Sequence, residues 1–163
     1  MTTISAASLY QVVLAVHIMA VVVAFGVTFA YPIMFAVSGR RDPRSLPTVH
    51  RIEYTVERLL INPGLLVALL AGIYLASKGH HWSEFYVQWG LAAVIVIGAL
   101  VGSVMIPTAK RAEQAAERDL AASGEGTVEL SDEYRAIVRR LSILGALLSA
   151  LVLVTILLMA IRA

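Results

Sequence analysis

An uncharged run of 21 residues occupies positions 141–161, LSILGALLSALVLVTILLMAI. A helix rises about 1.5 Å per residue and the hydrocarbon core of a bilayer is about 30 Å thick, so about 20 apolar residues are enough to cross it. Three further stretches of this kind lie at residues 9–37, 59–77 and 85–107. The sequence therefore predicts four membrane-spanning helices.

Composition places the whole chain in the membrane class. Hydrophobic residues make up 59% of the 163 residues and charged residues 15%, whereas soluble domains average about half and about a quarter. We expect a single transmembrane domain over residues 1–163, in which residues 9–37 are a retained helix because they outrun the ~7–15 residue core of a signal peptide. Because the chain has no cysteine, disulfides, iron–sulfur clusters and thiolate metal sites are excluded.

The connections between the four stretches predict an all-α fold, an antiparallel up-down four-helix membrane bundle. We expect the second helix to begin near Thr48 and the third to continue through residues 108–122, beyond its apolar stretch. Ser131 precedes two acidic residues, a pattern typical of a helix N-terminus, so the fourth helix is expected to begin there. The third and fourth helices would then form a helical extension in the cytoplasm.

The basic residues predict an orientation. Eleven of the thirteen lysines and arginines lie in two connections, between the first and second spans and between the third and fourth. By the positive-inside rule both connections face the cytoplasm, and both termini are periplasmic or extracellular. We therefore expect a multi-pass protein of the bacterial inner membrane. We expect these basic residues to contact anionic lipid headgroups, and we do not expect them to bind nucleic acid.

Small residues recur at a spacing of four on three of the predicted helices. Such rows let helix backbones approach closely, either within one chain or between copies. Both alternatives remain open, and we expect a homo-oligomer or a place in a larger membrane complex. The rows are Gly64, Ala68 and Gly72 in the second helix, Gly98 and Gly102 in the third, and Gly145 and Ser149 in the fourth.

His17 is the one ionisable residue well inside the first helix. Tyr10, Ala24 and Tyr31 lie at heptad spacing from it, so this row is predicted to face into the bundle. Three interpretations stay open, namely a neutral histidine hydrogen-bonded to a neighbouring helix, a metal or haem ligand, and a proton relay. We expect residues 63–66 at the level of His17, and His50 at the cytoplasmic end.

A polar stripe descends the second helix from the cytoplasmic rim. Glu53 and Glu57 lie beside it, and Pro63 below it removes an amide donor and allows a kink. One interpretation is an anion or propionate site built on the arginine of the stripe, with one of the glutamates setting its geometry. The other is an interfacial arginine that reaches the headgroups. The stripe consists of Thr55, Arg58 and Asn62.

The sequence gives little indication of catalysis. We find no nucleophile paired with a base, no phosphate-binding glycine loop and no paired carboxylates within the membrane, so we predict no catalytic residue. His80 and His81 lie near Glu84 in the connection between the second and third spans, where a copper or zinc site is an alternative to ordinary solvated side chains.

Two spacings resemble known membrane families. Tyr31-Pro32 follows His17 by fourteen residues, and Glu53, Pro63 and Gly72 follow one another along the second helix. These positions resemble the first two helices of the HemJ-type protoporphyrinogen oxidases and the related CopD-like membrane proteins. The chain is also similar to four-span bacterial integral membrane proteins to which no activity is attached.

The HemJ-type resemblance implies a haem b site with His17 as an axial ligand to the iron. Arg58, Asn62 and Gln88 are then the candidate residues around the cofactor, near its propionates or a quinone. The implied function is membrane redox chemistry or electron transfer. The alternative is a non-catalytic accessory subunit of a larger respiratory, photosynthetic or transport complex.

Overall fold

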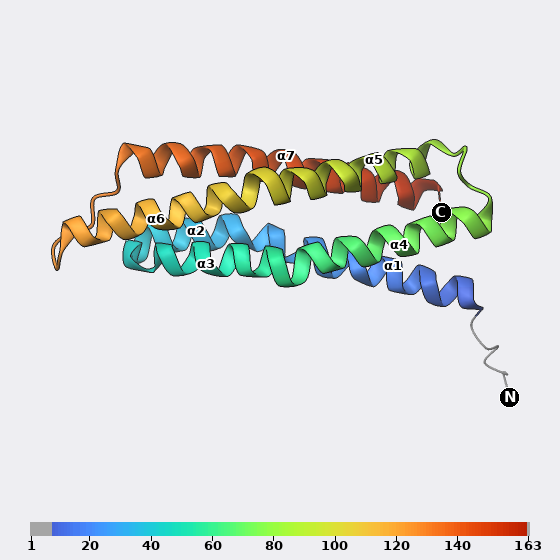
Figure 1. Cartoon of the computed structure of the whole chain (residues 1–163), viewed down its shortest axis with the longest axis horizontal. Coiled ribbons are helices and arrows are strands. Elements are labelled where there is room, and N and C mark those ends of the chain that lie inside the picture. Colours follow the sequence, from blue (N-terminus) through green and yellow to red (C-terminus); the bar gives the residue numbers. More distant parts are fainter. Residues whose placement is uncertain (1–7, 163) are drawn as a thin grey trace, which may run out of the picture.

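A computed structural model describes residues 8–162, which form four long helical rods and no strand (Figure 1). The rods Leu9–Arg41, Pro43–Gly79, Phe85–Ser123 and Asp132–Ile161 are each long and apolar enough to cross a membrane. The prediction of four spans in an all-α protein is confirmed. Because the rods are 30 to 39 residues long, each is longer than the about 20 residues that a bilayer requires.

Three of the rods contain an irregular turn. The first comprises α1 (Leu9–Gly26), a 3₁₀ turn (Val27–Ala30) and α2 (Tyr31–Arg41). The second comprises a 3₁₀ turn (Pro43–Ser45), α3 (Leu46–Val56), a π turn (Glu57–Ile61) and α4 (Asn62–Gly79). The third comprises α5 (Phe85–Leu100), a π turn (Val101–Met105) and α6 (Ile106–Ser123), and the fourth is α7 (Asp132–Arg162).

A proline follows each irregular turn inside the first three rods. Pro32, Pro63 and Pro107 all lie two positions after the turn's last residue. A proline lacks the amide hydrogen that would continue the ladder, and its ring crowds the carbonyl four residues earlier, so the preceding turn must tighten or widen. The kink expected at Pro63 is thus a π turn, in which the Asn62 amide donates to the Glu57 carbonyl.

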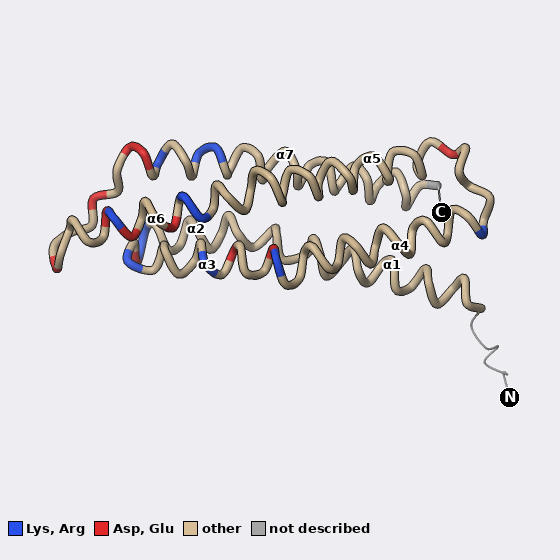
Figure 2. Tube along the Cα trace, in the orientation of Figure 1, with Lys and Arg blue, Asp and Glu red and all other residues tan. Residues whose placement is uncertain are grey.

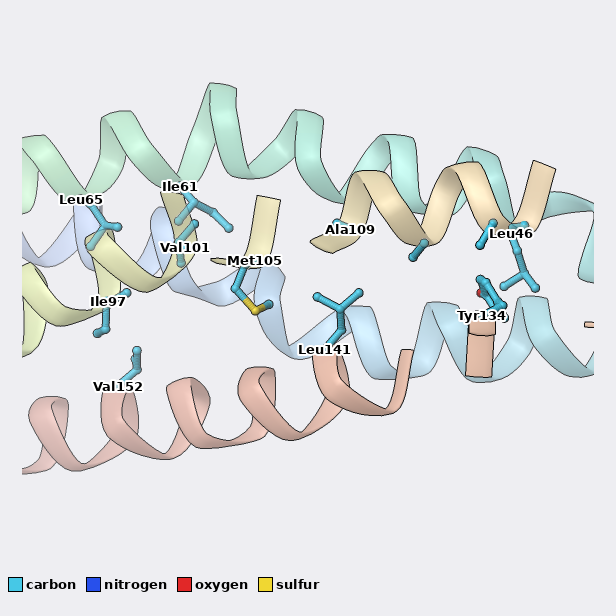
Figure 3. Packing of buried hydrophobic residues seen from close by; sticks show 13 residues of the cluster. Leu46, Ile61, Leu65, Ile97, Val101, Met105, Ala109, Tyr134, Leu141 and Val152 are labelled. Atoms are coloured by element: carbon cyan, nitrogen blue, oxygen red, sulfur yellow. The ribbon is translucent and has the colours of Figure 1, made fainter. Parts of the chain in front are cut away.

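The rods alternate in direction, and rods that are consecutive in the sequence lie side by side. Most close contacts join α1 to α4, α3 to α6 and α5 to α7. Figure 3 shows Ile61 and Leu65 of the second rod beside Val101 of the third, in the buried apolar cluster. The same cluster continues along α6 through a row of alanines, whose small side chains allow α3 to approach closely. These alanines are Ala109, Ala112, Ala115 and Ala116.

Only part of the small-residue pattern serves packing within the chain. A Cβ added at Gly64 would lie 2.9 Å from the Cβ of Ala24, so this glycine is required for the close approach of α1 and α4. A Cβ added at Gly98, Gly102 or Gly145 would meet nothing within 4 Å. These three glycines therefore leave room on the outer faces of α5, of the π turn that follows it and of α7.

Charged residues gather at one end of the bundle (Figure 2). This end contains the α2–α3 corner and the loop from α6 to α7, and the other end contains both termini of the described chain. An Arg44 guanidinium nitrogen donates to the carbonyls of Gly124 and Gly126, at 2.7 and 2.9 Å, and so joins the corner to the loop.

The fourth helix begins as predicted. The Tyr134 amide donates to the hydroxyl of Ser131 at 3.2 Å, which is N-capping geometry, and α7 starts at Asp132. α6 continues unbroken to Ser123, so helices do extend beyond the third and fourth apolar stretches. α3 begins at Leu46, two residues before the predicted start at Thr48.

Candidate functional site

His17 lies in α1, where its ring contacts α4. Its Nδ1 is 2.8 Å from the carbonyl oxygen of Ala68. Because a carbonyl only accepts, Nδ1 carries the hydrogen and donates, which leaves the lone pair of the neutral ring on Nε2. A Cβ added at Gly72 would lie 3.3 Å from His17 Cε1, so the glycine gives the ring its place against α4.

The level of His17 differs from the prediction by one or two turns. Ala68 and Gly72 lie beside it, whereas residues 63–66 were expected. The π turn accounts for part of this shift, because it adds a residue to the second rod with little extra rise.

The heptad row on the first rod faces the bundle along most of its length. Ala24 and Tyr31 are buried and His17 is half-buried, but Tyr10 is 37% exposed. The row turns outward towards its beginning because α1 contacts mainly α4 and only one of its sides is covered.

The other three predicted cofactor residues are not gathered around His17. Arg58 is exposed in the π turn, roughly 15–20 Å along the helix axis from Gly72 by its residue separation. Asn62 is half-buried directly after that turn. Gln88 is exposed near the start of α5, where its amide donates to the Trp82 carbonyl at 3.2 Å. The structure therefore places them at separate levels of the bundle.

Arg58 lines a lateral cavity rather than the bundle interior. The cavity has a volume of about 250 Å³ and lies between the second and third rods, and Lys110 also lines it. In the described part of the chain Arg58 forms no ion pair with Glu53 or Glu57. The arginine faces outward whereas both glutamates are buried, so the predicted pairing within the stripe is not formed.

A buried polar cluster, which we call the His50 cluster, lies between α2, α3 and α7. Its members are Tyr31, His50, Glu53, Glu57 and Tyr134, and all five are buried. His50 Nδ1 lies 3.2 Å from Glu53 Oε2, and His50 Nε2 lies 3.1 Å from the Tyr134 hydroxyl. Both nitrogens of a completely buried imidazole are thus engaged.

Tyr31 and Glu57, the other two members of the cluster, differ in their hydrogen bonds. The Tyr31 hydroxyl donates to the backbone carbonyl of Glu53 at 3.4 Å. Glu57 lies one helical turn beyond Glu53 and is 3% exposed. Its Oε2 is the one buried side-chain oxygen or nitrogen, among the residues that the structure describes, without a hydrogen-bond partner. Such an atom calls for an explanation, because buried polar groups are nearly always paired.

Glu113 is another buried carboxylate, and unlike Glu57 it forms an ion pair within residues 8–162. It lies on α6, and the guanidinium of Arg51 on α3 contacts its Oε1 at 2.8 Å. The same guanidinium contacts Glu117 at 3.1 Å. Glu113 therefore has a cationic partner, and it provides a comparison for Glu57.

The His50 cluster was missed because its members resemble an ordinary helix rim in the sequence. His50 was expected at the cytoplasmic end, and the two glutamates beside a polar stripe that descends from the cytoplasmic rim. One signal was present: residues 50, 53 and 57 follow the i, i+3, i+7 spacing of a single helix face. Tyr134, 84 residues after His50, had no such signal.

No group of three metal-ligating side chains is found between residues 8 and 162. His80 adopts a left-handed backbone conformation that ends α4, and it is exposed.

The four apolar rods, with most charged residues gathered at one end of the bundle, define a multi-pass helical membrane protein. The chain belongs to a family described as predicted integral membrane protein (DUF2269), whose family model matches residues 11–163. No curated protein and no solved structure matches the chain at a significant level. The expected similarity to a family of integral membrane proteins is thus confirmed, and the HemJ-type resemblance stays a prediction.

Proposed function

We propose that this protein binds haem b in the membrane through His17 and serves redox chemistry or electron transfer. The observation behind this proposal is the 2.8 Å contact between His17 Nδ1 and the Ala68 carbonyl. Metal-ligating histidines almost always donate their second ring N–H to a carbonyl or carboxylate, which fixes the tautomer and orients the ring. His17 is held in this way, and its Nε2 is the nitrogen available to an iron.

We propose a haem with one protein ligand because His17 is the side chain at this level of the bundle that we expect to bind iron. Residues 85–101, which form α5 and the start of the following π turn, contain neither histidine nor lysine. This stretch therefore offers no second histidine or lysine ligand. In such a site His17 would be the single side-chain ligand of the haem.

When bound, haem supplies a one-electron iron couple whose potential depends on its axial ligand and surroundings. The chain contributes three things to such a site. His17 offers Nε2, the Ala68 carbonyl makes the imidazole a stronger donor, and Gly72 leaves the space in which the ring lies. The apolar helices at this level keep water away from the ring.

Haem titration of the detergent-purified protein tests this proposal. We expect a Soret band that saturates at one haem per chain and is lost in His17→Ala. His80→Asn is the matched control, because it removes an exposed histidine and keeps a residue that tolerates the left-handed backbone. An identical titration in His17→Ala, or no Soret band in the wild-type protein, would refute the proposal.

The orientation in the membrane is part of the same proposal. The charged end of the bundle, with the α2–α3 corner and the α6–α7 loop, would face the cytoplasm of a bacterial cell, and both termini the periplasm. The support is the concentration of lysine and arginine at that end (Figure 2).

A second candidate function is a non-catalytic subunit of a larger membrane complex. Gly98, Gly102 and Gly145 favour it, because a Cβ at each would meet open space and these glycines pack against nothing within the chain. Mild-detergent purification tests this candidate. A stoichiometric partner or a second copy that is lost in Gly102→Leu would support it, and a monomer in every mild detergent would oppose it.

A further inference from the structure

The His50 cluster lies apart from His17. Glu57 stands at the level where the apolar stretch of the second rod begins, and His50 and Glu53 lie further towards the charged end. Burying a polar group is unfavourable unless its hydrogen bonds are replaced, and buried ionisable groups in membrane helices mark ion or proton sites.

Tyr134, His50 and Glu53 form a continuous chain of hydrogen bonds. With Glu53 as a carboxylate, His50 Nδ1–H donates to its Oε2, and His50 Nε2 accepts from the Tyr134 hydroxyl. The imidazole therefore bridges a phenol and a carboxylate through its two nitrogens. A proton taken up at Nε2 can leave from Nδ1 without the ring leaving its place.

One end of this chain reaches the exposed loop between α6 and α7. Tyr134 lies in the first turn of α7, and its amide donates to the Ser131 hydroxyl oxygen. The Ser131 amide and hydroxyl both donate to Asp119 Oδ2, at 2.8 and 2.9 Å. Hydrogen-bonded polar groups thus lead from the charged end of the bundle to the backbone amide of Tyr134, the residue whose hydroxyl contacts His50.

Glu57 forms the other end. It lies one turn from Glu53 on the same helix face, where side chains are neighbours, and its Oε2 lacks a partner. Two charged groups of α6 have other partners, since Glu113 pairs with Arg51 and the Lys110 ammonium lies 5.6 Å from the centre of the Tyr54 ring. Tyr31, from α2, donates to the Glu53 carbonyl.

We infer that Glu57 is a proton-binding site of the membrane domain, loaded from the charged end of the bundle through Tyr134, His50 and Glu53. A metal ion fits less well, because the described residues offer no set of three suitable ligands. The inference is independent of haem at His17 and adds a second site to the protein.

The transfer moves one proton and no electrons. The Tyr134 hydroxyl hydrogen passes to His50 Nε2, and a hydronium ion at the charged end returns a proton to the phenol oxygen and leaves as water. The Nδ1 hydrogen passes to the Glu53 carboxylate. The resulting acid gives its proton to Glu57, which restores the Glu53 carboxylate. His50 then holds its hydrogen on Nε2, and a tautomer change readies it for the next proton.

Infrared spectroscopy of the full-length protein in lipid nanodiscs tests the binding site. We expect a carboxylic-acid C=O stretching band that shifts in D₂O, is lost in Glu57→Gln and moves in frequency in Glu57→Asp. Glu113→Gln is the matched control, since it removes a buried carboxylate that Arg51 pairs, and it should keep the band. A band that is unchanged in both Glu57 variants, or its absence from the wild-type protein, would overturn the inference. If Glu57→Gln does not elute as a folded protein in size-exclusion chromatography, the frequency shift of the C=O band in Glu57→Asp tests the inference by itself.

The path is tested by the rate at which that band shifts after transfer into D₂O. His50→Gln and Tyr134→Phe should each slow the exchange, roughly tenfold for the loss of one hydrogen-bonded step. His80→Gln replaces an exposed histidine at the other end and should leave the rate unchanged. Wild-type rates in both His50→Gln and Tyr134→Phe would remove the proposed path.

Discussion

The Tyr134 hydroxyl lies 3.1 Å from His50 Nε2, although 84 residues separate the two in the chain. This contact connects the first turn of α7 to the buried face of α3. It therefore fixes the fourth rod against the second at the charged end.

Tyr134→Phe should destabilise the protein. The variant keeps the ring but leaves a buried histidine nitrogen without a partner, which costs about 1–3 kcal/mol. We expect a lower midpoint of thermal unfolding in detergent. Tyr86→Phe, in the first turn of α5 at the other end, is the control and should leave the midpoint within error. A wild-type midpoint for Tyr134→Phe would mean that the contact does not stabilise the fold.

Gly64→Ala and Gly98→Ala should have opposite effects. The added methyl group at Gly64 meets the Cβ of Ala24 at 2.9 Å, so α1 and α4 must separate, at a cost of about 1–3 kcal/mol. The methyl group at Gly98 meets nothing within 4 Å, and replacing glycine in a helix is favourable by about 0.5–1 kcal/mol. Unfolding midpoints measured side by side check this, and equal shifts would contradict the packing of α1 on α4.

Arg44→Ala should loosen the loop between α6 and α7. It removes the two hydrogen bonds to Gly124 and Gly126, but because Arg44 is exposed the loss is about 0–1 kcal/mol. We expect a glutamate-specific protease to cleave after Glu125 or Glu129 a few times faster, with global stability nearly unchanged. Arg40→Ala, another exposed arginine near the corner, should cleave at the wild-type rate. Equal rates in both variants would show that Arg44 does not hold the loop.

The orientation can be measured directly because the chain has no cysteine. Ser83→Cys places a thiol in the connection between α4 and α5, and Glu125→Cys places one in the α6–α7 loop. We expect a membrane-impermeant maleimide to label the first in intact cells and the second only after lysis. The reverse pattern would invert the proposed topology.

The spans were predictable because the thickness of the hydrocarbon layer requires about 20 consecutive apolar residues, and runs of that length can be recognised in the sequence alone. Ser131 was predictable as an N-cap for a similar reason, since capping depends on residues close in the chain. The sequence predicted a kink of the second helix at Pro63, and the structure has a distortion there, but the prediction did not specify that it would be a π turn. That outcome depends on how the whole second rod packs.

The His50 cluster could not be predicted in the same way. Glu53 and Glu57 precede an apolar stretch, where charged residues usually meet headgroups or water. Only tertiary contacts from α2 and α7 bury them, and Tyr31 and Tyr134 come from those distant segments. For Arg58 two interpretations were open, an anion or propionate site and an interfacial arginine, and the residue lies exposed on an outer face.

The most direct test of the proposed function is chemical rescue at His17. In His17→Gly we expect haem binding to be lost and to return when free imidazole is added, as a Soret band that saturates with imidazole concentration. A His17→Gly protein that binds haem as the wild type does, without imidazole, would contradict the assignment of His17 as the ligand.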